Sequence, residues 1–135
     1  MDSGRLENNS RMNRRIMVVD DDSSLRGILE EILTDEGWDV VSAKDGYQAV
    51  EMASEFGINL FLMDISMPGM NGVDAFLAIK ERRPNCVTVM MTGFAENDLV
   101  QKALSSGVTT VLYKPLSIED LLAILDKAVP ESFPF

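Results

Sequence analysis

Short β-type runs alternate with helical patterns along the chain, and this alternation restricts the fold more than any other feature. The first apolar run, Ile16-Met17-Val18-Val19, stops at three consecutive aspartates. A helical apolar pattern follows, with Ser23 or Ser24 as the expected N-cap and Gly37 after the last turn. Further strands are expected at 39–43, 59–63, 86–91 and 109–113, and further helices near 46–56, 72–82, 96–105 and 118–128. The pattern is that of repeated βα units.

Five βα units predict an α/β domain with one parallel sheet and helices on both of its faces. The continuous apolar character of 16–19 and 59–63 suits central strands, whereas Asp39 and Ser42 make 39–43 a candidate edge strand. Right-handed crossovers leave few topologies, and we expect the flavodoxin-like, doubly wound order 2-1-3-4-5. This gives three segments: a flexible polar tail at 1–14, one domain at 15–129 and a short C-terminal tail at 130–135.

The charge of the chain is strongly acidic and unevenly distributed. The net charge is −10, but residues 1–15 hold four arginines against Asp2 and Glu7, so the tail carries +2 and the remainder −12. Because so acidic a body repels a phosphate backbone, we expect no direct binding of nucleic acid. With 46% apolar and 25% charged residues, and no apolar run of about 18–20 residues, the composition is typical of a soluble globular protein rather than a membrane protein.

Two residue types limit the chemistry. The chain has no histidine, which excludes catalytic triads with a histidine base, histidine-ligated metal sites and a phosphohistidine of its own. Its one cysteine, Cys86, cannot form an internal disulfide, which fits a reducing cytoplasm. Any reactive site must therefore use other side chains, carboxylates foremost among them.

Reactive polar residues stand where four of the predicted strands end. Strand 1 ends at Asp20-Asp21-Asp22, strand 3 at Asp64, strand 4 at Thr92 and strand 5 at Lys114. Each alone has an ordinary interpretation, as a helix-capping acid, a turn residue, a strand end or an exposed lysine. Open parallel sheets, however, bind ligands beyond the carboxyl ends of their strands. Four complementary groups at that edge favour a site.

The chemistry of this set points to phosphorus. Asp20, Asp21 and Asp64 held close together would repel, which raises a pKa or recruits a cation, and Mg²⁺ prefers such oxygen ligands. A neutralised aspartate is a nucleophile that can form an aspartyl phosphate. The phosphoryl oxygens would then need the cation, the ammonium of Lys114 and the hydroxyl of Thr92. The residues therefore predict phosphoryl acceptance on a carboxylate.

The same segments resemble the receiver domains of two-component response regulators, including the chemotaxis regulator type. The resemblance covers about residues 15–129, and Asp64 and Thr92 are 28 residues apart while Thr92 and Lys114 are 22 apart, as in that family. It implies that Asp64 is the phosphoacceptor, Thr92 the switch hydroxyl and Lys114 the partner first of the acceptor and then of the phosphoryl group. The segments that carry it are Val18-Val19-Asp20-Asp21-Asp22, Met63-Asp64-Ile65-Ser66-Met67-Pro68-Gly69-Met70-Asn71-Gly72, Met91-Thr92-Gly93 and Lys114-Pro115.

The resemblance also implies a metal site and a peptide geometry. Mg²⁺ would be the cofactor, ligated by Asp21, Asp64 and the backbone carbonyl of Ser66, while Asp20 would act largely through a bound water. The Lys114–Pro115 peptide bond would be cis.

By resemblance, the chain accepts phosphate from the phosphohistidine of a sensor histidine kinase or a phosphotransfer protein. A shift between two conformations would then alter the surface of helix 4, strand 5 and helix 5, about residues 95–129, for a downstream effector. We expect no enzymatic activity beyond self-catalysed phosphorylation and dephosphorylation, a cytoplasmic location without membrane attachment, and a phosphorylation-dependent dimer as an open option.

Two positions, Val111 and Phe94, depart from the family pattern, and Phe94 stands where the family often has a polar side chain. Val111 stands three residues before the lysine, where an aromatic side chain usually rotates inward as the threonine moves. Tyr113 lies on the same strand face by the period of two and is a candidate substitute. Ser66 and Phe94 border the approach of a hydrolytic water and offer it little orientation, so we expect a long-lived phosphorylated state.

Three alternatives belong to other functional classes. A pseudo-receiver would signal without phosphate, against which stand the complete acidic set, Thr92 and Lys114. A phosphatase of the haloacid dehalogenase type would need a second aspartate two residues after Asp64, where Ser66 stands. Flavin binding would need a first loop rich in serine and threonine, and this chain has aspartates there.

Overall fold

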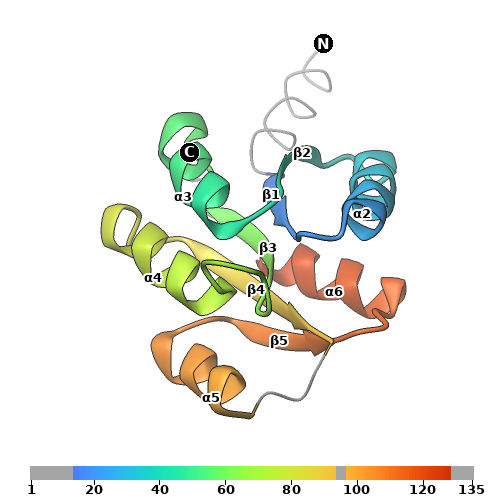
Figure 1. Ribbon diagram of the computed structural model, residues 1–135. Coiled ribbons are helices and arrows are strands. Elements are labelled where there is room, and N and C mark those ends of the chain that lie inside the picture. Colours follow the sequence, from blue (N-terminus) through green and yellow to red (C-terminus); the bar gives the residue numbers. More distant parts are fainter. Residues whose placement is uncertain (1–13, 94–96, 129–135) are drawn as a thin grey trace.

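A computed structural model describes residues 14–93 and 97–128 as five parallel strands with helices between them (Figure 1). The strand order is β2-β1-β3-β4-β5, which confirms the expected flavodoxin-like topology with β2 at an edge. The strands are β1 (Arg15–Val19), β2 (Asp39–Ala43), β3 (Leu60–Asp64), β4 (Val87–Thr92) and β5 (Thr110–Tyr113). The helices are α2 (Ser23–Asp35), α3 (Gly46–Phe56), α4 (Gly72–Arg82), α5 (Asn97–Ser106) and α6 (Ile118–Ala128).

The sheet has a hydrophobic core on each face. Helices α3, α4 and α5 cover one face, and α2 and α6 cover the other (Figure 1). Because successive side chains of a strand point to opposite faces, Met17 and Val19 enter the first core while Ile16 and Val18 enter the second. Both central strands are thus buried on two sides, which explains their continuous apolar sequences.

The strands that carry the polar residues extend further than the apolar runs indicate. The runs predict strands that stop at Met63 and Met91, but β3 includes Asp64 and β4 includes Thr92. Backbone pairing continues by one residue, with Asp64 beside Met91 and Thr92 beside Tyr113. Asp64 and Thr92 are therefore held by the sheet itself and not by a loop.

The expected N-cap of the first helix is wrong. Asp22 caps α2, and its carboxylate accepts hydrogen bonds from the backbone N–H groups of Ser24 and Leu25, at 3.0 and 3.2 Å. Ser23, proposed as a cap with Ser24, is already the first helical residue. A carboxylate next to the unpaired N–H groups of the first turn is favoured by their partial positive charge, and this decides the competition. The expected stop at Gly37 holds, with a φ of +93° just beyond α2.

Several expectations fall on residues outside the described ranges, namely most of the tail at 1–14, the segment 130–135 and Phe94. Arg14 is described and is well anchored: its guanidinium is 3.0 Å from the carboxylate of Asp126 and 5.1 Å from the ring centre of Trp38. Arg14, which the sequence analysis assigned to the tail, thus contacts α6 and the residue before β2. Among the residues that the structure describes, no helix is long and apolar enough to cross a membrane.

Candidate functional site

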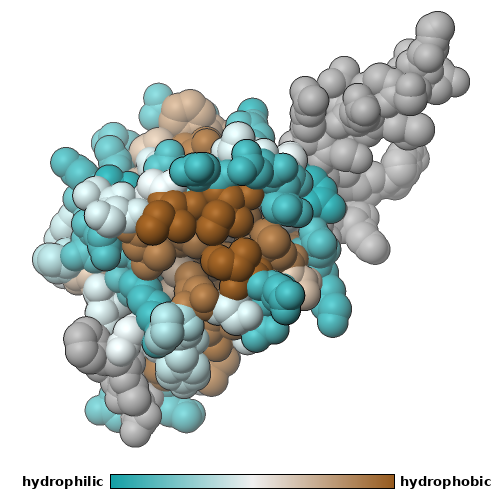
Figure 2. Space-filling view, turned by 90° about the vertical axis from the view of Figure 1, so that its right-hand side faces the viewer, coloured by the Kyte–Doolittle hydropathy of each residue, from teal (hydrophilic) through white to brown (hydrophobic). Residues whose placement is uncertain are grey.

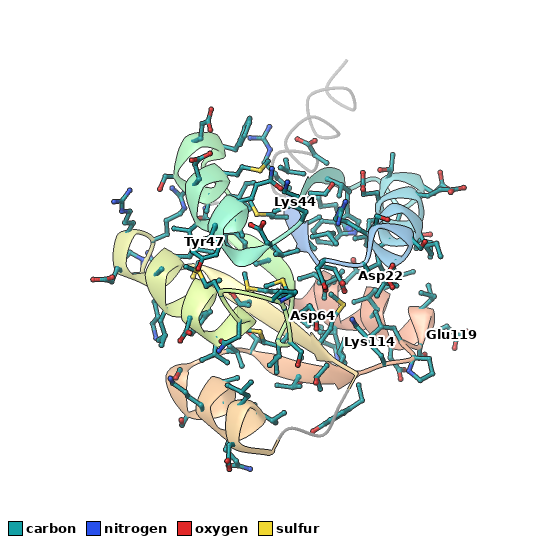
Figure 3. All side chains as sticks on the ribbon, in the orientation of Figure 1. Asp22, Lys44, Tyr47, Asp64, Lys114 and Glu119 are labelled. Atoms are coloured by element: carbon teal, nitrogen blue, oxygen red, sulfur yellow. The ribbon has the colours of Figure 1, made fainter. Side chains whose placement is uncertain are left out.

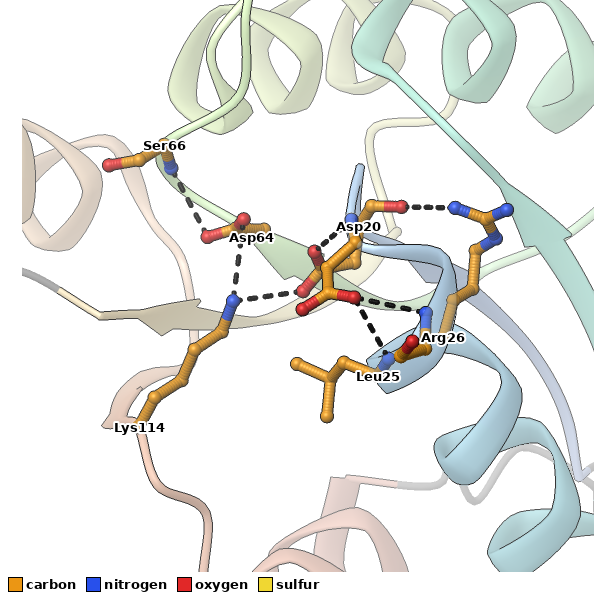
Figure 4. Close-up of polar contacts among 8 residues, drawn as sticks. Asp20, Leu25, Arg26, Asp64, Ser66 and Lys114 are labelled. Carbon is orange, nitrogen blue, oxygen red and sulfur yellow. Dashed lines mark hydrogen bonds and ion pairs between the residues drawn. The ribbon is translucent and has the colours of Figure 1, made fainter.

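Three strand ends place a lysine between two aspartates (Figures 3 and 4). Asp20 directly follows β1, Asp64 is the last residue of β3, and Lys114 directly follows β5. The Nζ atom of Lys114 is 3.0 Å from Oδ2 of Asp20 and 3.4 Å from Oδ2 of Asp64. One ammonium group therefore bridges two carboxylates from different strands.

Asp20 is completely buried, and three hydrogen bonds hold it in place. Its Oδ1 accepts the backbone N–H of Asp22 at 2.9 Å, and its Oδ2 accepts Lys114. The guanidinium of Arg26, on the first turn of α2, donates to the Asp20 backbone carbonyl at 2.7 Å (Figure 4). The carboxylate is thus held in one orientation before any ligand arrives.

Asp64 is only 4% exposed, and its surroundings disfavour its charge. Burial, followed by the negative charge of Asp20, raises the pKa of Asp64 to about 6, although Lys114 and the Ser66 N–H oppose the shift. That N–H donates to Asp64 Oδ1 at 3.2 Å. Burial alone would lower the pKa of Lys114, but its hydrogen bond to Asp20 and the charges of both carboxylates outweigh burial and raise it. The site therefore favours additional positive charge.

A divalent cation fits this demand. Asp20, Asp21 and Asp64 each offer a carboxylate oxygen, and these oxygens lie within 4.8 Å of one another. Among the described residues, Lys114 is the only cationic side chain within salt-bridge distance of these carboxylates. Asp21 is exposed to solvent. Clustered oxygen ligands with one side open suit Mg²⁺, which keeps part of its water shell. Ser66, the fourth expected ligand, lies two residues beyond Asp64 and is tied to it through its N–H.

Thr92 is completely buried at the end of β4 and is connected to the lysine through the backbone. Its carbonyl accepts the N–H of Lys114 at 2.8 Å, and the following Lys114–Pro115 bond is cis, as expected. A Cβ added at the neighbouring Gly93 would lie 3.7 Å from Cδ of Lys114, so the lysine stem runs close past this backbone. All the predicted site residues therefore gather at one edge of the sheet.

Strand β5 shows what replaces the usual aromatic residue. Val111 is half-buried and packs on the core under α3, α4 and α5, whereas Leu112 packs on the opposite core. The alternation puts Tyr113 on the Val111 side, 57% exposed, and Tyr113 is the direct pairing partner of Thr92 in the sheet. The sequence analysis placed Tyr113 on this face but missed that pairing.

Two further features escaped sequence reasoning. Arg26 donates to the backbone carbonyl of Asp20, and the spacing of residues in the sequence does not predict a contact of this kind. An apolar cavity of about 260 Å³ beside the site is formed by α2 and the segment after β5, with Lys114 on its wall. Its apolar lining comes from Leu25, Ile28, Leu29, Pro115, Leu116 and Ile118.

Known proteins resemble this chain in sequence and in fold. The family model for the response regulator receiver domain matches residues 16–126. The transcriptional regulatory protein PdtaR of Mycobacterium tuberculosis is 38% identical over 117 residues, which are 86% of this chain and 57% of PdtaR. Sporulation initiation phosphotransferase F of Bacillus subtilis is 30% identical over 119 residues, covering 88% of this chain and 96% of that protein.

The solved structures agree with the sequence comparisons. The crystal structure of a CheY-like receiver domain protein from Methanospirillum hungatei has a TM-score of 0.83 at 28% identity, and the match covers 86% of this chain and 93% of that one. The chain spans little more than half the length of PdtaR but nearly all of phosphotransferase F. With the family match running from β1 into α6 and enclosing every residue of the site, this chain belongs to the response regulator receiver domains of two-component signalling.

Proposed function

We propose that this receiver domain accepts a phosphoryl group on Asp64 from the phosphohistidine of a sensor kinase or phosphotransfer protein. The observation that carries the proposal is the nearly buried Asp64 carboxylate, with two further carboxylates beside it and the Lys114 ammonium 3.4 Å away. Membership of the receiver family supports it. The chain has no histidine, so the donor histidine lies outside these 135 residues.

Receiver domains typically bind Mg²⁺ through acidic residues, and the carboxylates here fit that ion. Asp21, Asp64 and the carbonyl of Ser66 would hold it directly, and Asp20 would do so through a water molecule. When bound, the ion neutralises the carboxylates and the phosphoryl oxygens. The rigid hold on Asp20 and Asp64 presents these ligands without prior rearrangement.

The transfer needs a nucleophile and groups already in place to stabilise the negative charge on the phosphoryl oxygens. A carboxylate oxygen of Asp64 attacks phosphorus, a P–O bond forms, and the P–N bond to the donor imidazole breaks, with its electron pair returning to nitrogen. Lys114 then exchanges its contact with the acceptor carboxylate for one with the new phosphoryl group, and the hydroxyl of Thr92 donates to another phosphoryl oxygen. The chain catalyses its own phosphorylation and hydrolysis and acts on no separate substrate.

Signalling follows from the link between Thr92 and β5. Thr92 pairs with Tyr113 and accepts the N–H of Lys114 through its carbonyl, so a shift of Thr92 toward the phosphoryl group displaces β5. The surface of α5, β5 and α6 then changes for a downstream effector in the cytoplasm. With Val111 in the usual aromatic position, exposed Tyr113 is the side chain that reports the change.

The apolar cavity beside Lys114 is the docking site for the phosphodonor protein. A donor histidine can reach Asp64 only if its protein covers the adjoining surface, and that surface includes Ile28, 54% exposed, and Ile118. Figure 2 shows a hydrophobic patch on the face that carries α2 and α6. An exposed apolar patch rimmed by polar residues marks a protein-binding surface.

Two of the three alternatives, the phosphatase and the phosphate-independent receiver, do not share this support. A haloacid-dehalogenase-type phosphatase needs an acid at position 66, and half-buried Ser66 stands there with its N–H bound to Asp64. A phosphate-independent receiver would have no use for a raised Asp64 pKa or for a lysine held between two carboxylates.

The charge of Asp64 should destabilise the metal-free fold. Its pKa is about 6 when folded against a model value of 3.8, so in this range the folded state binds more protons and stability falls as pH rises. Asp64→Asn should therefore be more stable than wild type at neutral pH and should lose this advantage near pH 4. Urea denaturation in the presence of a chelator measures the difference, with exposed Glu51→Gln as the control. A difference that does not vary with pH would contradict the assigned pKa.

Acetyl phosphate with Mg²⁺ tests the acceptor directly. Wild type should gain one phosphoryl group by intact mass, and Asp64→Asn should gain none. Lys114→Ala should react at least about tenfold more slowly, because the transition state loses a charged partner. The exposed lysine Lys127 offers the matched control, since Lys127→Ala removes the same charge far from the site. Uptake by Asp64→Asn equal to that of wild type would refute the proposal.

Ile28→Glu tests the donor surface. The phosphodonor is a phosphorylated kinase core that reacts with wild type. The added charge should slow transfer from this core about tenfold, equivalent to about 1.4 kcal/mol of barrier. Transfer from acetyl phosphate, which needs no docking, should stay unchanged. Phe56→Glu, at the far end of α3 and also exposed, is the control. If Ile28→Glu and Phe56→Glu transfer equally fast from the kinase core, the donor docks elsewhere.

A further inference from the structure

The loop between β3 and α4 carries the residues that follow Asp64, and both of its ends are fixed. The N–H of Gly72 donates to the carbonyl of Ile65 at 2.8 Å, and a Cβ at Gly72 would overlap the carbonyl of Asp64, so the loop returns tightly onto its start. At the far end, the side chain of Asn71 caps α4 by accepting the N–H of Asp74 at 2.9 Å. In the middle of the loop, Met67 is buried in the core under α3, α4 and α5, and Met70 packs against that core, whereas Pro68 and Gly69 are exposed.

The start of α3 contacts the middle of this loop at two adjacent points. A Cβ added at Gly46 would lie 3.0 Å from Cβ, Cγ and O of Met70. The Tyr47 ring meets Gly69 similarly, with Cε2 3.1 Å from the place of an added Cβ. Gly69 has a φ of +82°, in the left-handed region that favours glycine, so the loop reaches the ring through a turn that other residues adopt with strain.

The Tyr47 side chain is 62% exposed, although it is aromatic. One edge of the Tyr47 ring lies against Gly69, and much of the side chain is open to solvent. Tyr47 lies on the side of the molecule where α3 and α4 are adjacent (Figure 3). The side chain therefore contributes little to either hydrophobic core. The main contact of the Tyr47 ring is therefore the one with Gly69 of the loop.

The first turn of α3 is a firm base for such a contact. The carboxylate of Asp45 accepts the N–H of Gln48 at 2.8 Å, and the Gln48 side chain in turn accepts the N–H of Lys44 at 2.8 Å. The first bond satisfies one of the free N–H groups at the helix start, and the second ties the residue before the cap to the first turn. Tyr47 lies between these bonded residues, so its backbone is held on both sides.

We propose that Tyr47 is a positioning residue that braces the β3–α4 loop and so holds Ser66 in place beside Asp64. The inference rests on the proposed function, in which the Ser66 carbonyl and Asp64 bind Mg²⁺. A loop ordered in advance adds no ordering cost when the cation binds, whereas a loosened loop must be ordered at that step. Loss of the ring should therefore weaken Mg²⁺ binding and slow phosphorylation.

Three variants separate the brace from general stability. Tyr47→Ala removes the ring, Tyr47→Phe keeps it without the hydroxyl, and Phe56→Ala removes another exposed ring from the other end of α3. We expect Tyr47→Ala to bind Mg²⁺ about three- to tenfold more weakly by calorimetry. We also expect the amides of residues 66, 67, 69 and 70 to exchange faster. Its phosphorylation by acetyl phosphate at saturating Mg²⁺ should be slower by a similar factor. Tyr47→Phe and Phe56→Ala should match wild type.

The outcomes distinguish this inference from the proposed function. A Tyr47→Ala protein that melts at a lower temperature, but binds Mg²⁺ and exchanges its loop amides as wild type does, shows a structural role alone and overturns the brace. A Tyr47→Phe protein as impaired as Tyr47→Ala also overturns it, because the hydroxyl would then be responsible. If wild type itself takes up no phosphoryl group, the proposed function fails, while loop exchange still tests the brace.

Discussion

A single ammonium group among three carboxylates is the interaction on which this structure depends. Lys114 contacts Asp20 and Asp64 at the carboxyl edge of the sheet, and Asp21 adds its charge from the solvent side. One lysine cannot balance three aspartates, and burial strengthens the repulsion that remains. The raised pKa of Asp64 is the result, and it leaves the site short of positive charge. A bound cation would relieve this imbalance, and its charge would also offset that of an incoming phosphoryl group.

The fold supplies the rigidity that this arrangement needs. Asp20 and Lys114 are 94 positions apart in sequence, and only the parallel order of the strands brings them together. Strand pairing extends through Asp64 and Thr92, so neither residue depends on a loop for its position. The hydrogen bond from Lys114 N–H to the Thr92 carbonyl then joins the cationic side of the site to the strand pair β4 and β5. The backbone therefore connects the surroundings of the acceptor to β5.

The sequence predicted the strand order and the gathering of the polar residues because both follow from periodic patterns. An apolar run ending in a polar residue indicates a strand end, and parallel strands share one edge. The Asp22 cap was assigned to the wrong residue because three acids and two serines compete for one helix start. Arg26, the Tyr47 contact with Gly69 and the apolar cavity were missed for a common reason. Each depends on how two separate segments of the chain meet in space, and the residue period within one helix or strand does not encode that.

The most direct test of the account is chemical identification of the phosphorylated residue. An aspartyl phosphate is an acyl phosphate, which borohydride reduces to homoserine, whereas phosphate esters of serine and threonine resist reduction. After incubation with Mg²⁺ and a phosphodonor, reduction and peptide mass analysis should show homoserine at position 64 and at no other aspartate. Conversion at Asp20 or Asp21, or a phosphate that remains on a serine or threonine, would contradict the central role given to Asp64.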